Sequence, residues 1–118
     1  MDMNTITSLF SLFSGESDTD RFLPIVTTAC EEVRSTLREN ADTSATGLCY
    51  LAAAVANLRY TEIYFARENT LATYAGTIAR ESDATQRLHF AQQLVKSYQR
   101  LCRELIRDSS AFLLSVKG

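Results

Sequence analysis

The chain has 118 residues, a formal net charge of −2, and 46% hydrophobic and 22% charged residues, as is ordinary for one globular domain. Four glycines and one proline among many Ala, Leu, Glu and Arg residues favour helix over sheet. The longest uncharged run, residues 48–56, is about half of what spans a bilayer, and residues 1–13 lack the basic start of a signal peptide. We therefore expect one all-α domain over residues 1–118 that does not enter a membrane.

The first segment has the pattern of a short amphipathic helix over about residues 5–13. Its apolar positions recur at intervals of three and four: Ile6, Leu9, Phe10 and Phe13. Asn4 or Thr5 is expected to cap this helix, and Gly15 to end it. A helix of about nine residues is not stable alone in water, so we expect it to dock on the rest of the protein.

A second helix is predicted over about residues 19–38, with Ser17 or Asp18 as its N-cap. Pro24 then falls in the first turn or so, where proline is tolerated, and it is better placed if the helix begins nearer Phe22. The expected core stripe consists of Phe22, Val26, Ala29, Cys30, Val33 and Leu37.

The central helix is predicted over residues 46–68. Residues 48–56 are apolar on every side and include four alanines, which is typical of a helix enclosed by neighbours that approach closely. From Asn57 onward, polar residues alternate with aromatic ones, so this half is expected to emerge toward the surface.

A protruding loop, or a small β-hairpin or strand, is expected over residues 69–83, because Tyr74, Thr77 and Ile78 favour extended structure and Gly76 favours a turn. The last helix is predicted over about residues 83–108. Its core stripe is expected to be Leu88, Ala91, Leu94, Val95, Tyr98, Leu101, Cys102 and Leu105. Residues 109–118 lose this periodicity and resemble an extended apolar tail that must cover a surface.

The sequence contains no arrangement that predicts catalysis. Cys30, Cys49 and Cys102 are widely spaced and lie at apolar helical positions, and His89 is the sole histidine, so no zinc set is expected. Glu31 and Glu32 are adjacent and point about 100° apart on a helix. We expect a protein that is not an enzyme and that uses no cofactor and no metal.

Two surface features suggest binding instead. Lys96, Arg100, Arg103 and Arg107 are spaced by four, three and four, which places four cations on one face of the predicted last helix. This stripe fits either a contact with phosphates or, as we favour, a solvated face or a mate for acidic residues. The second feature comprises the apolar chain ends, with Leu9, Phe10 and Phe13 at one end and Phe112, Leu113 and Leu114 at the other. These ends pack either on their own core or on a neighbouring subunit.

Charge is unevenly distributed along the chain. Residues 1–83 hold 6 Lys or Arg against 12 Asp or Glu, a net charge of −6, whereas residues 84–118 hold 6 against 2, a net charge of +4. The two parts are electrically complementary, within one molecule or between copies.

The order of these features resembles the small helical head–tail connector (adaptor, head-completion) proteins of bacteriophages and prophages. The resemblance covers most of the chain. It rests on the short first helix, the DTDRFLPIVTTACEEV stretch at 18–33, the LAAAVANLRY stretch at 51–60, the TYAGTI stretch at 73–78, and the final helix with its apolar tail.

The resemblance implies a structural virion protein that forms a ring of identical subunits beneath the portal, extends the DNA channel and prepares the head for tail attachment. Its partners would be further copies of itself, the portal protein and tail-side adaptor proteins, with non-specific DNA contact in the channel. The protein would lie in the host cytoplasm during assembly and then in the virion. Tyr74, Gly76 and Ile78, together with the apolar chain ends, would contact neighbouring subunits. The alternative from the residues is a small helical nucleic-acid-binding or regulatory protein that uses the basic stripe.

Overall fold

The computed structural model of the protein describes residues 1–68 and 74–107, with only the backbone described for residues 66–68 and 74–82. This part of the chain is helical and contains no strand, which confirms the expected all-α class for the described residues. Its helices are α1 (Met3–Ser14), the 3₁₀ turn η1 (Thr19–Phe22), α2 (Leu23–Thr36), α3 (Thr46–Glu68) and α4 (Tyr74–Leu101).

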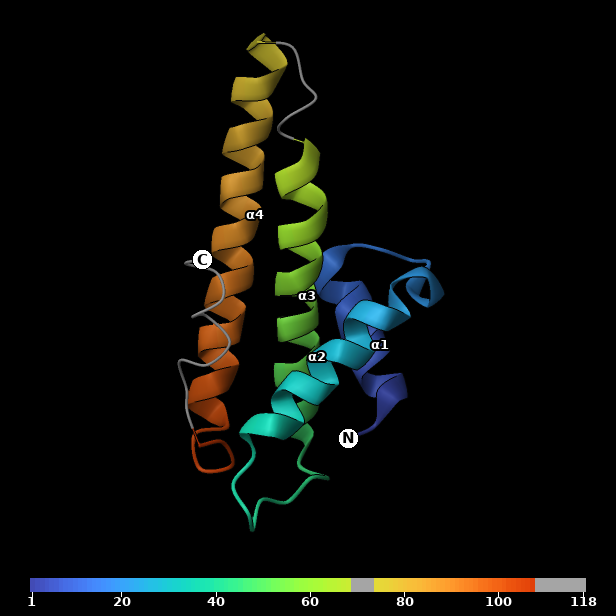
Figure 1. Cartoon of the computed structure of the whole chain (residues 1–118), viewed down its shortest axis with the longest axis vertical. Helices are drawn as coiled ribbons and strands as arrows, with labels where there is room; N and C mark the ends of the chain where they lie inside the picture. Colours follow the sequence, from blue (N-terminus) through green and yellow to red (C-terminus); the bar gives the residue numbers. More distant parts are fainter. Residues whose placement is uncertain (69–73, 108–118) are drawn as a thin grey trace.

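Helix α3 is the centre of the molecule. In Figure 1, α3 and α4 lie side by side as a long hairpin, and α1 and α2 cross α3 on the side away from α4. Every residue from Leu51 to Ala56 is buried, as the all-round apolar sequence predicts. The prediction that α3 emerges toward the surface from Asn57 onward is wrong for its next turn, because Asn57, Tyr60 and Thr61 are also buried. Alanines at positions 52, 53, 54 and 56 are all 0% exposed, so helices approach this stretch on several sides.

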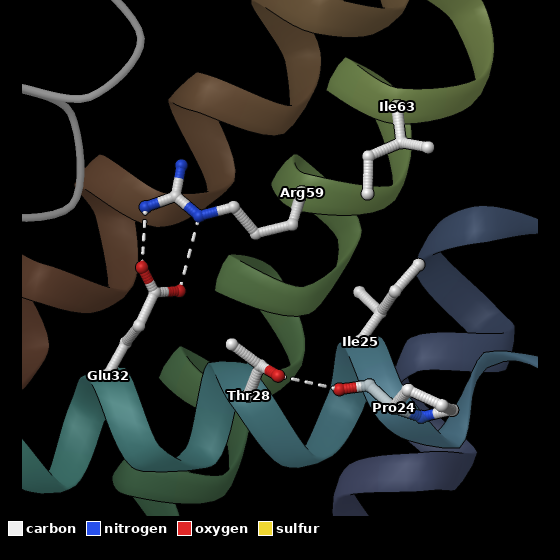
Figure 2. Close-up of a pocket in the computed structure, with 6 residues that line it drawn as sticks. All are labelled: Pro24, Ile25, Thr28, Glu32, Arg59 and Ile63. Atoms are coloured by element: carbon white, nitrogen blue, oxygen red, sulfur yellow. Dashed lines mark hydrogen bonds and ion pairs between the residues drawn. The ribbon is translucent and has the colours of Figure 1, made fainter.

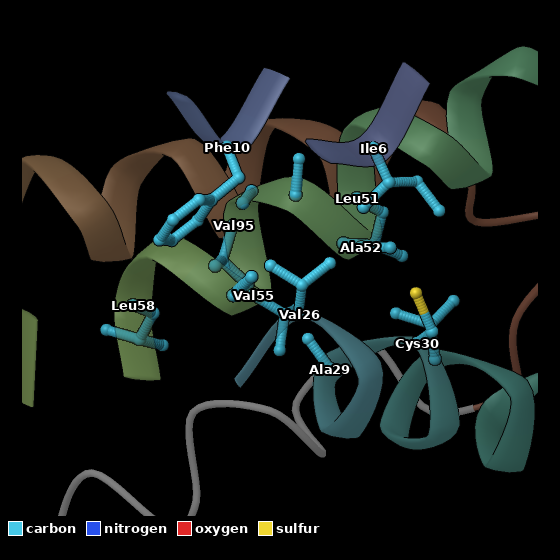
Figure 3. Close-up of a cluster of buried hydrophobic side chains, with 14 of the residues drawn as sticks. Ile6, Phe10, Val26, Ala29, Cys30, Leu51, Ala52, Val55, Leu58 and Val95 are labelled. Atoms are coloured by element: carbon cyan, nitrogen blue, oxygen red, sulfur yellow. The ribbon is translucent and has the colours of Figure 1, made fainter. Parts of the chain in front are cut away.

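The core joins all four α-helices, as Figure 3 shows. Ile6 and Phe10 of α1 and Val26 of α2 face α3, and Val95 closes the core from α4. Complete burial of a side chain such as Val, Leu or Phe contributes about 1.5–3 kcal/mol, so this shared core supplies much of the stability. The expected docking of the short first helix is therefore confirmed.

Both ends of α1 have defined caps. Asp2, rather than the predicted Asn4 or Thr5, is the N-cap, and its Oδ1 accepts a hydrogen bond from the Asn4 backbone N–H at 3.1 Å. Gly15 ends the helix as predicted. Its φ of 81° is left-handed, and its N–H donates to the Ser11 carbonyl at 2.9 Å.

The second predicted helix is divided in two. Residues 19–22 form the 3₁₀ turn and α2 starts at Leu23, so Pro24 sits in the first turn, where its missing N–H has no helical partner to lose. This is the later start that Pro24 favours.

The largest difference from the sequence prediction concerns α4. Residues 74–83 are helical, where a loop or β element was predicted, and residues 69–73 lie outside the described residues. Apart from proline, helix propensity differs by no more than about 1 kcal/mol between residue types, so a few β-branched residues and Gly76 do not end a long helix. The helix also stops at Leu101 rather than near residue 108. Leu101, which was predicted to be a core residue, is 74% exposed, whereas Cys102 and Ile106 after it are buried in the core. The predicted tail, residues 109–118, lies outside the described residues.

An antiparallel β-bridge between Leu37 and Ile106 ties the end of α2 to the segment after α4. The Arg38 N–H donates to the Leu105 carbonyl at 2.8 Å, and the Arg107 N–H donates to the Thr36 carbonyl at 2.6 Å. Close packing continues at the start of α3, where a Cβ on Gly47 would lie 3.2 Å from the Cys102 Sγ.

Candidate functional site

A groove of about 400 Å³ lies between α2 and α3, as shown in Figure 2. Pro24, Ile25 and Thr28 line it from α2, and Ile63 faces Ile25 from α3. Ile63 is 41% exposed. We call this surface the α2–α3 groove.

An ion pair between Arg59 and Glu32 lies at one end of the α2–α3 groove. Arg59 of α3 donates to both carboxylate oxygens of Glu32 of α2, from Nη2 at 3.0 Å and from Nε at 3.2 Å, and its Nη1 donates to Glu62 at 3.1 Å. Burial by itself would lower the pKa of Arg59, but the hydrogen bonds and charges of Glu32 and Glu62 outweigh burial and raise it. A guanidinium that donates two parallel hydrogen bonds to one carboxylate restricts the relative position of the two helices that carry the pair.

A cluster of aromatic rings surrounds Tyr60 on the side of α3 that faces α1 and η1. The ring centroids of Phe10, Phe22 and Tyr64 lie 5.7, 5.2 and 5.2 Å from that of Tyr60. The Tyr60 hydroxyl donates a short hydrogen bond to the Glu16 carboxylate. Burial and this bond raise the pKa of Tyr60 above its ordinary value of 10.0. These ring contacts and the Tyr60–Glu16 hydrogen bond hold α1, η1 and α3 together.

A second hollow, of about 40 Å³, lies where α1, α3 and α4 meet. Asn57, Thr61 and Arg87 provide polar atoms, with Phe13 and Phe90 at its edges. A volume of this size holds no more than a water molecule or two. It therefore offers no room for an organic substrate.

The apolar residues proposed for subunit contacts fall into three groups. Phe10 is fully buried in its own core, and Leu9 and Phe13 are half-buried against that core, with the Phe13 ring stacked on Tyr98 at 6.1 Å. These three therefore have partners within their own chain. Tyr74, Gly76 and Ile78 lie in the first turns of α4, where only the backbone is described. Phe112, Leu113 and Leu114 lie outside the described residues.

The basic stripe does not lie on one helix face. Lys96 and Arg100 are exposed on α4, but the helix ends at Leu101, so Arg103 and Arg107 follow in the turn beyond it. The Arg107 guanidinium donates a short hydrogen bond to the Ser35 carbonyl, which directs it toward α2. Arg38, which the sequence reading did not include, lies beside this turn and donates to the carbonyls of Ile106 at 2.9 Å and Arg103 at 3.4 Å. The prediction that the four cations lie on one face of a single helix is therefore wrong.

The cysteines and the histidine are placed as expected for structural residues. Cys30, Cys49 and Cys102 are free and buried, and burial raises the pKa of the Cys30 and Cys102 thiols. His89 is exposed on α4. Among the residues that the structure describes, no group of three His, Cys, Asp or Glu side chains is arranged to hold a metal ion.

The sequence analysis did not predict the exposure of three apolar side chains, those of Leu12, Phe90 and Leu101, or the burial of the Gln99 amide. Leu12 is 75% exposed, and Phe90 is 54% exposed. Leu12 lies off the apolar stripe of its helix, which was a usable signal, whereas Leu101 was assigned to the core stripe of its helix and is 74% exposed. Gln99 is 3% exposed, and its Nε2 has no hydrogen-bond partner in the part of the chain that the structure describes. No pattern in the sequence marks this amide.

Within residues 1–68 and 74–107, none of the helices combines the length and the apolar character needed to cross a membrane. The chain matches no protein-family model, no curated protein sequence and no solved structure.

Proposed function

We propose that the protein is a non-enzymatic structural subunit of a phage or prophage particle that assembles into a ring at the head–tail junction. The observation that carries this proposal is the long α3–α4 hairpin, one end of which extends beyond the layer formed by α1 and α2 (Figure 1). A head-to-tail ring contact joins two different surfaces of the same subunit. The projecting end of the hairpin and the α1–α2 side are two such surfaces.

Charge and shape support the same proposal. The acidic character of residues 1–83 and the basic character of residues 84–118 provide complementary surfaces for repeated contacts. The principal-axis extents of 52 × 28 × 18 Å describe an elongated subunit. The contacts proposed between neighbours are the start of α4, with Tyr74, Gly76 and Ile78, and the apolar residues near the C-terminus, Phe112, Leu113 and Leu114. Portal and tail-side adaptor proteins are the proposed partners above and below the ring.

Assembly on a portal is the decisive test. Sedimentation velocity and negative-stain microscopy are performed on a concentration series of the purified protein, alone and with purified portal protein. The expected result is a ring-shaped species, either at high protein concentration or on the portal. A protein that stays monomeric at high concentration and adds nothing to the portal would overturn the proposal.

A matched pair of variants identifies the contact surface. Ile78→Glu places a charge at the start of α4, where the subunit contact is proposed, and Gln93→Glu places the same charge at an exposed position further along the helix. Ile78→Glu is expected to abolish the ring and Gln93→Glu to leave it intact. Circular dichroism of both variants verifies that the helices remain. Equal assembly by both variants would exclude this part of α4 from the contact.

Nucleic-acid binding is distinguished by salt dependence. Lys96 and Arg100 are exposed cations, so duplex DNA affinity is measured at two salt concentrations for the parent and for the variant Arg100→Glu plus Arg103→Glu. No binding at low salt removes this alternative. Affinity that falls with salt and is lost in the double variant would favour the alternative over a ring protein.

A further inference from the structure

We propose that the hollow of about 40 Å³ between α1, α3 and α4 is a binding site for one small inorganic anion of the size of chloride. Its polar lining comes from three helices, with Ser14 of α1, Asn57 and Thr61 of α3, and Arg87 of α4. Arg87 is a cation, and no Asp or Glu is among the described residues that line the hollow. The inference goes beyond the proposed ring and does not rest on it.

Asn57 brings a buried amide to the hollow. This residue is 3% exposed, and its backbone carbonyl accepts a hydrogen bond from the Thr61 hydroxyl at 2.7 Å. Its side-chain amide has no hydrogen bond to any of the described residues, and a buried amide without a partner costs the folded state free energy. A ligand in the hollow that accepts a hydrogen bond from the Asn57 Nδ2 removes this cost.

Arg87 holds its guanidinium beside the same hollow. Its Nε donates to the Asp83 Oδ2 at 3.2 Å, and its Cζ lies 4.4 Å from the centroid of the Phe65 ring. These two contacts restrict the orientation of the guanidinium, and its Nη1 and Nη2 donate to none of the described residues. The side chain is 49% exposed, so an ion can reach it from solvent.

The hydrogen bonds around the hollow favour an anion over a water molecule. The Ser14 Oγ accepts from the Glu16 N–H at 3.2 Å, which leaves the Ser14 hydroxyl hydrogen to donate. The Thr61 hydrogen is already bonded to the Asn57 carbonyl. Ser14, Asn57 and Arg87 therefore all have hydrogen atoms for a ligand. A water molecule must donate as well as accept, whereas a monatomic anion only accepts and is also attracted by the guanidinium.

Neighbouring charge and size define the ligand further. Two carboxylates lie near the hollow, and each already has a donor, because Glu16 accepts from the Tyr60 hydroxyl and Asp83 accepts from Arg87. A hollow of about 40 Å³ holds no more than a water molecule or two, so a chloride ion fits and a sulfate or phosphate ion with four oxygens does not. The ligand class is therefore a monatomic anion.

The anion connects three helices, because its donors come from α1, α3 and α4. A ligand that binds the folded chain and not the unfolded chain stabilises the fold by mass action. Chloride is thus expected to stabilise this protein beyond the general effect of salt.

Chlorine NMR of sodium chloride with the full-length protein tests the site, because the chloride resonance broadens when the ion exchanges with a protein site. The parent protein is expected to broaden the resonance. Added bromide is expected to reverse the broadening, whereas gluconate at the same ionic strength, which is too large for the hollow, is expected to leave it unchanged. Arg87→Gln and, separately, Asn57→Leu are expected to reduce the broadening severalfold. Arg100→Gln is the matched control, because Arg100 is an exposed arginine further along the same helix.

Urea unfolding at constant ionic strength provides a second readout. The urea midpoint is expected to be higher in chloride than in gluconate for the parent and for Arg100→Gln, and this difference is expected to disappear in Arg87→Gln. Circular dichroism verifies folding, and Arg87→Gln alone suffices if Asn57→Leu unfolds. A chloride resonance that the parent leaves sharp would overturn the proposal and assign the hollow to water. Equal broadening by Arg87→Gln and Arg100→Gln would also overturn it, because the ion would then be attracted by surface charge in general.

Discussion

Arg59 and Glu32 join α3 to α2 through two parallel hydrogen bonds, whereas the side chain of the neighbouring Glu31 bonds, among the described residues, only to Arg34 of its own helix. The two adjacent glutamates therefore differ in what they hold together. The Glu32 side chain is 33% exposed and its partner Arg59 is 16% exposed, while Glu31 is 66% exposed.

Replacing Glu32 is expected to cost more stability than replacing Glu31. Glu32→Gln loses a charge-assisted pair between helices and should lower the free energy of unfolding by about 1–2 kcal/mol. Glu31→Gln loses an exposed i,i+3 pair and should change it by less than about 0.5 kcal/mol. Urea unfolding followed by circular dichroism measures both. Equal losses would show that the bridge between helices contributes nothing beyond a surface pair.

The hydroxyl of Tyr60 is predicted to stabilise the turn after α1. Tyr60→Phe keeps the ring in the aromatic cluster but removes the donor to Glu16, which should cost about 1.5–3 kcal/mol because the acceptor is a carboxylate. Tyr64→Phe is the control, because Tyr64 packs its ring on Tyr60 and Phe22 without a hydrogen bond from its hydroxyl within the described chain. A Tyr60→Phe variant as stable as Tyr64→Phe would contradict the prediction.

Stability at high pH should depend on the same hydroxyl. The folded protein raises the pKa of Tyr60 above 10.0, its ordinary value, so above pH 10 the folded state holds a proton that the unfolded state has released. The free energy of unfolding then falls as pH rises, by at most about 1.4 kcal/mol per pH unit from this one group. Subtracting the profile of Tyr60→Phe isolates its share. Parallel profiles above pH 10 would refute the assignment.

Gln99 should be replaceable with a gain in stability. Its Nε2 is buried and has no hydrogen-bond partner among the described residues, which is a cost of about 1–3 kcal/mol to the folded state. Gln99→Met preserves the length of the side chain without the amide and should raise the free energy of unfolding by about 1 kcal/mol. Gln93→Met, at an exposed position of the same helix, should leave it unchanged. A loss of stability in Gln99→Met would show that the amide is satisfied.

The sequence was most informative where burial is complete. The predicted range 46–68 coincides with α3, whose uncharged first half fits an enclosed helix. The end of α1 at Gly15 was predicted because glycine adopts the left-handed conformation without a steric penalty. Residues 74–83 were predicted incorrectly because local preference for extended structure is weak compared with continuation of a long helix.

The candidate site was less accessible to sequence reasoning. The Glu31–Glu32 pair was recognised only as two carboxylates pointing apart, and nothing in the pattern indicates that Arg59, 27 residues later, bonds to the second of them. The prediction that four basic residues share one helix face was wrong for a related reason. It assumed that the helix continues past Leu101, where α4 ends. Contacts between distant segments depend on where helices end and where they cross, and the helical periodicity of a sequence does not predict either.

The position of α3 in the chain also determines the order in which the protein can fold during synthesis. Helices α1 and α2 pack mainly on α3 and touch each other along a short stretch only. Residues 1–45 therefore leave the ribosome before the helix that covers Phe10 and Val26 has been made, and their apolar faces stay open until residue 58 or so is available. The nascent chain is thus most exposed to chaperones and proteases just before its third helix emerges.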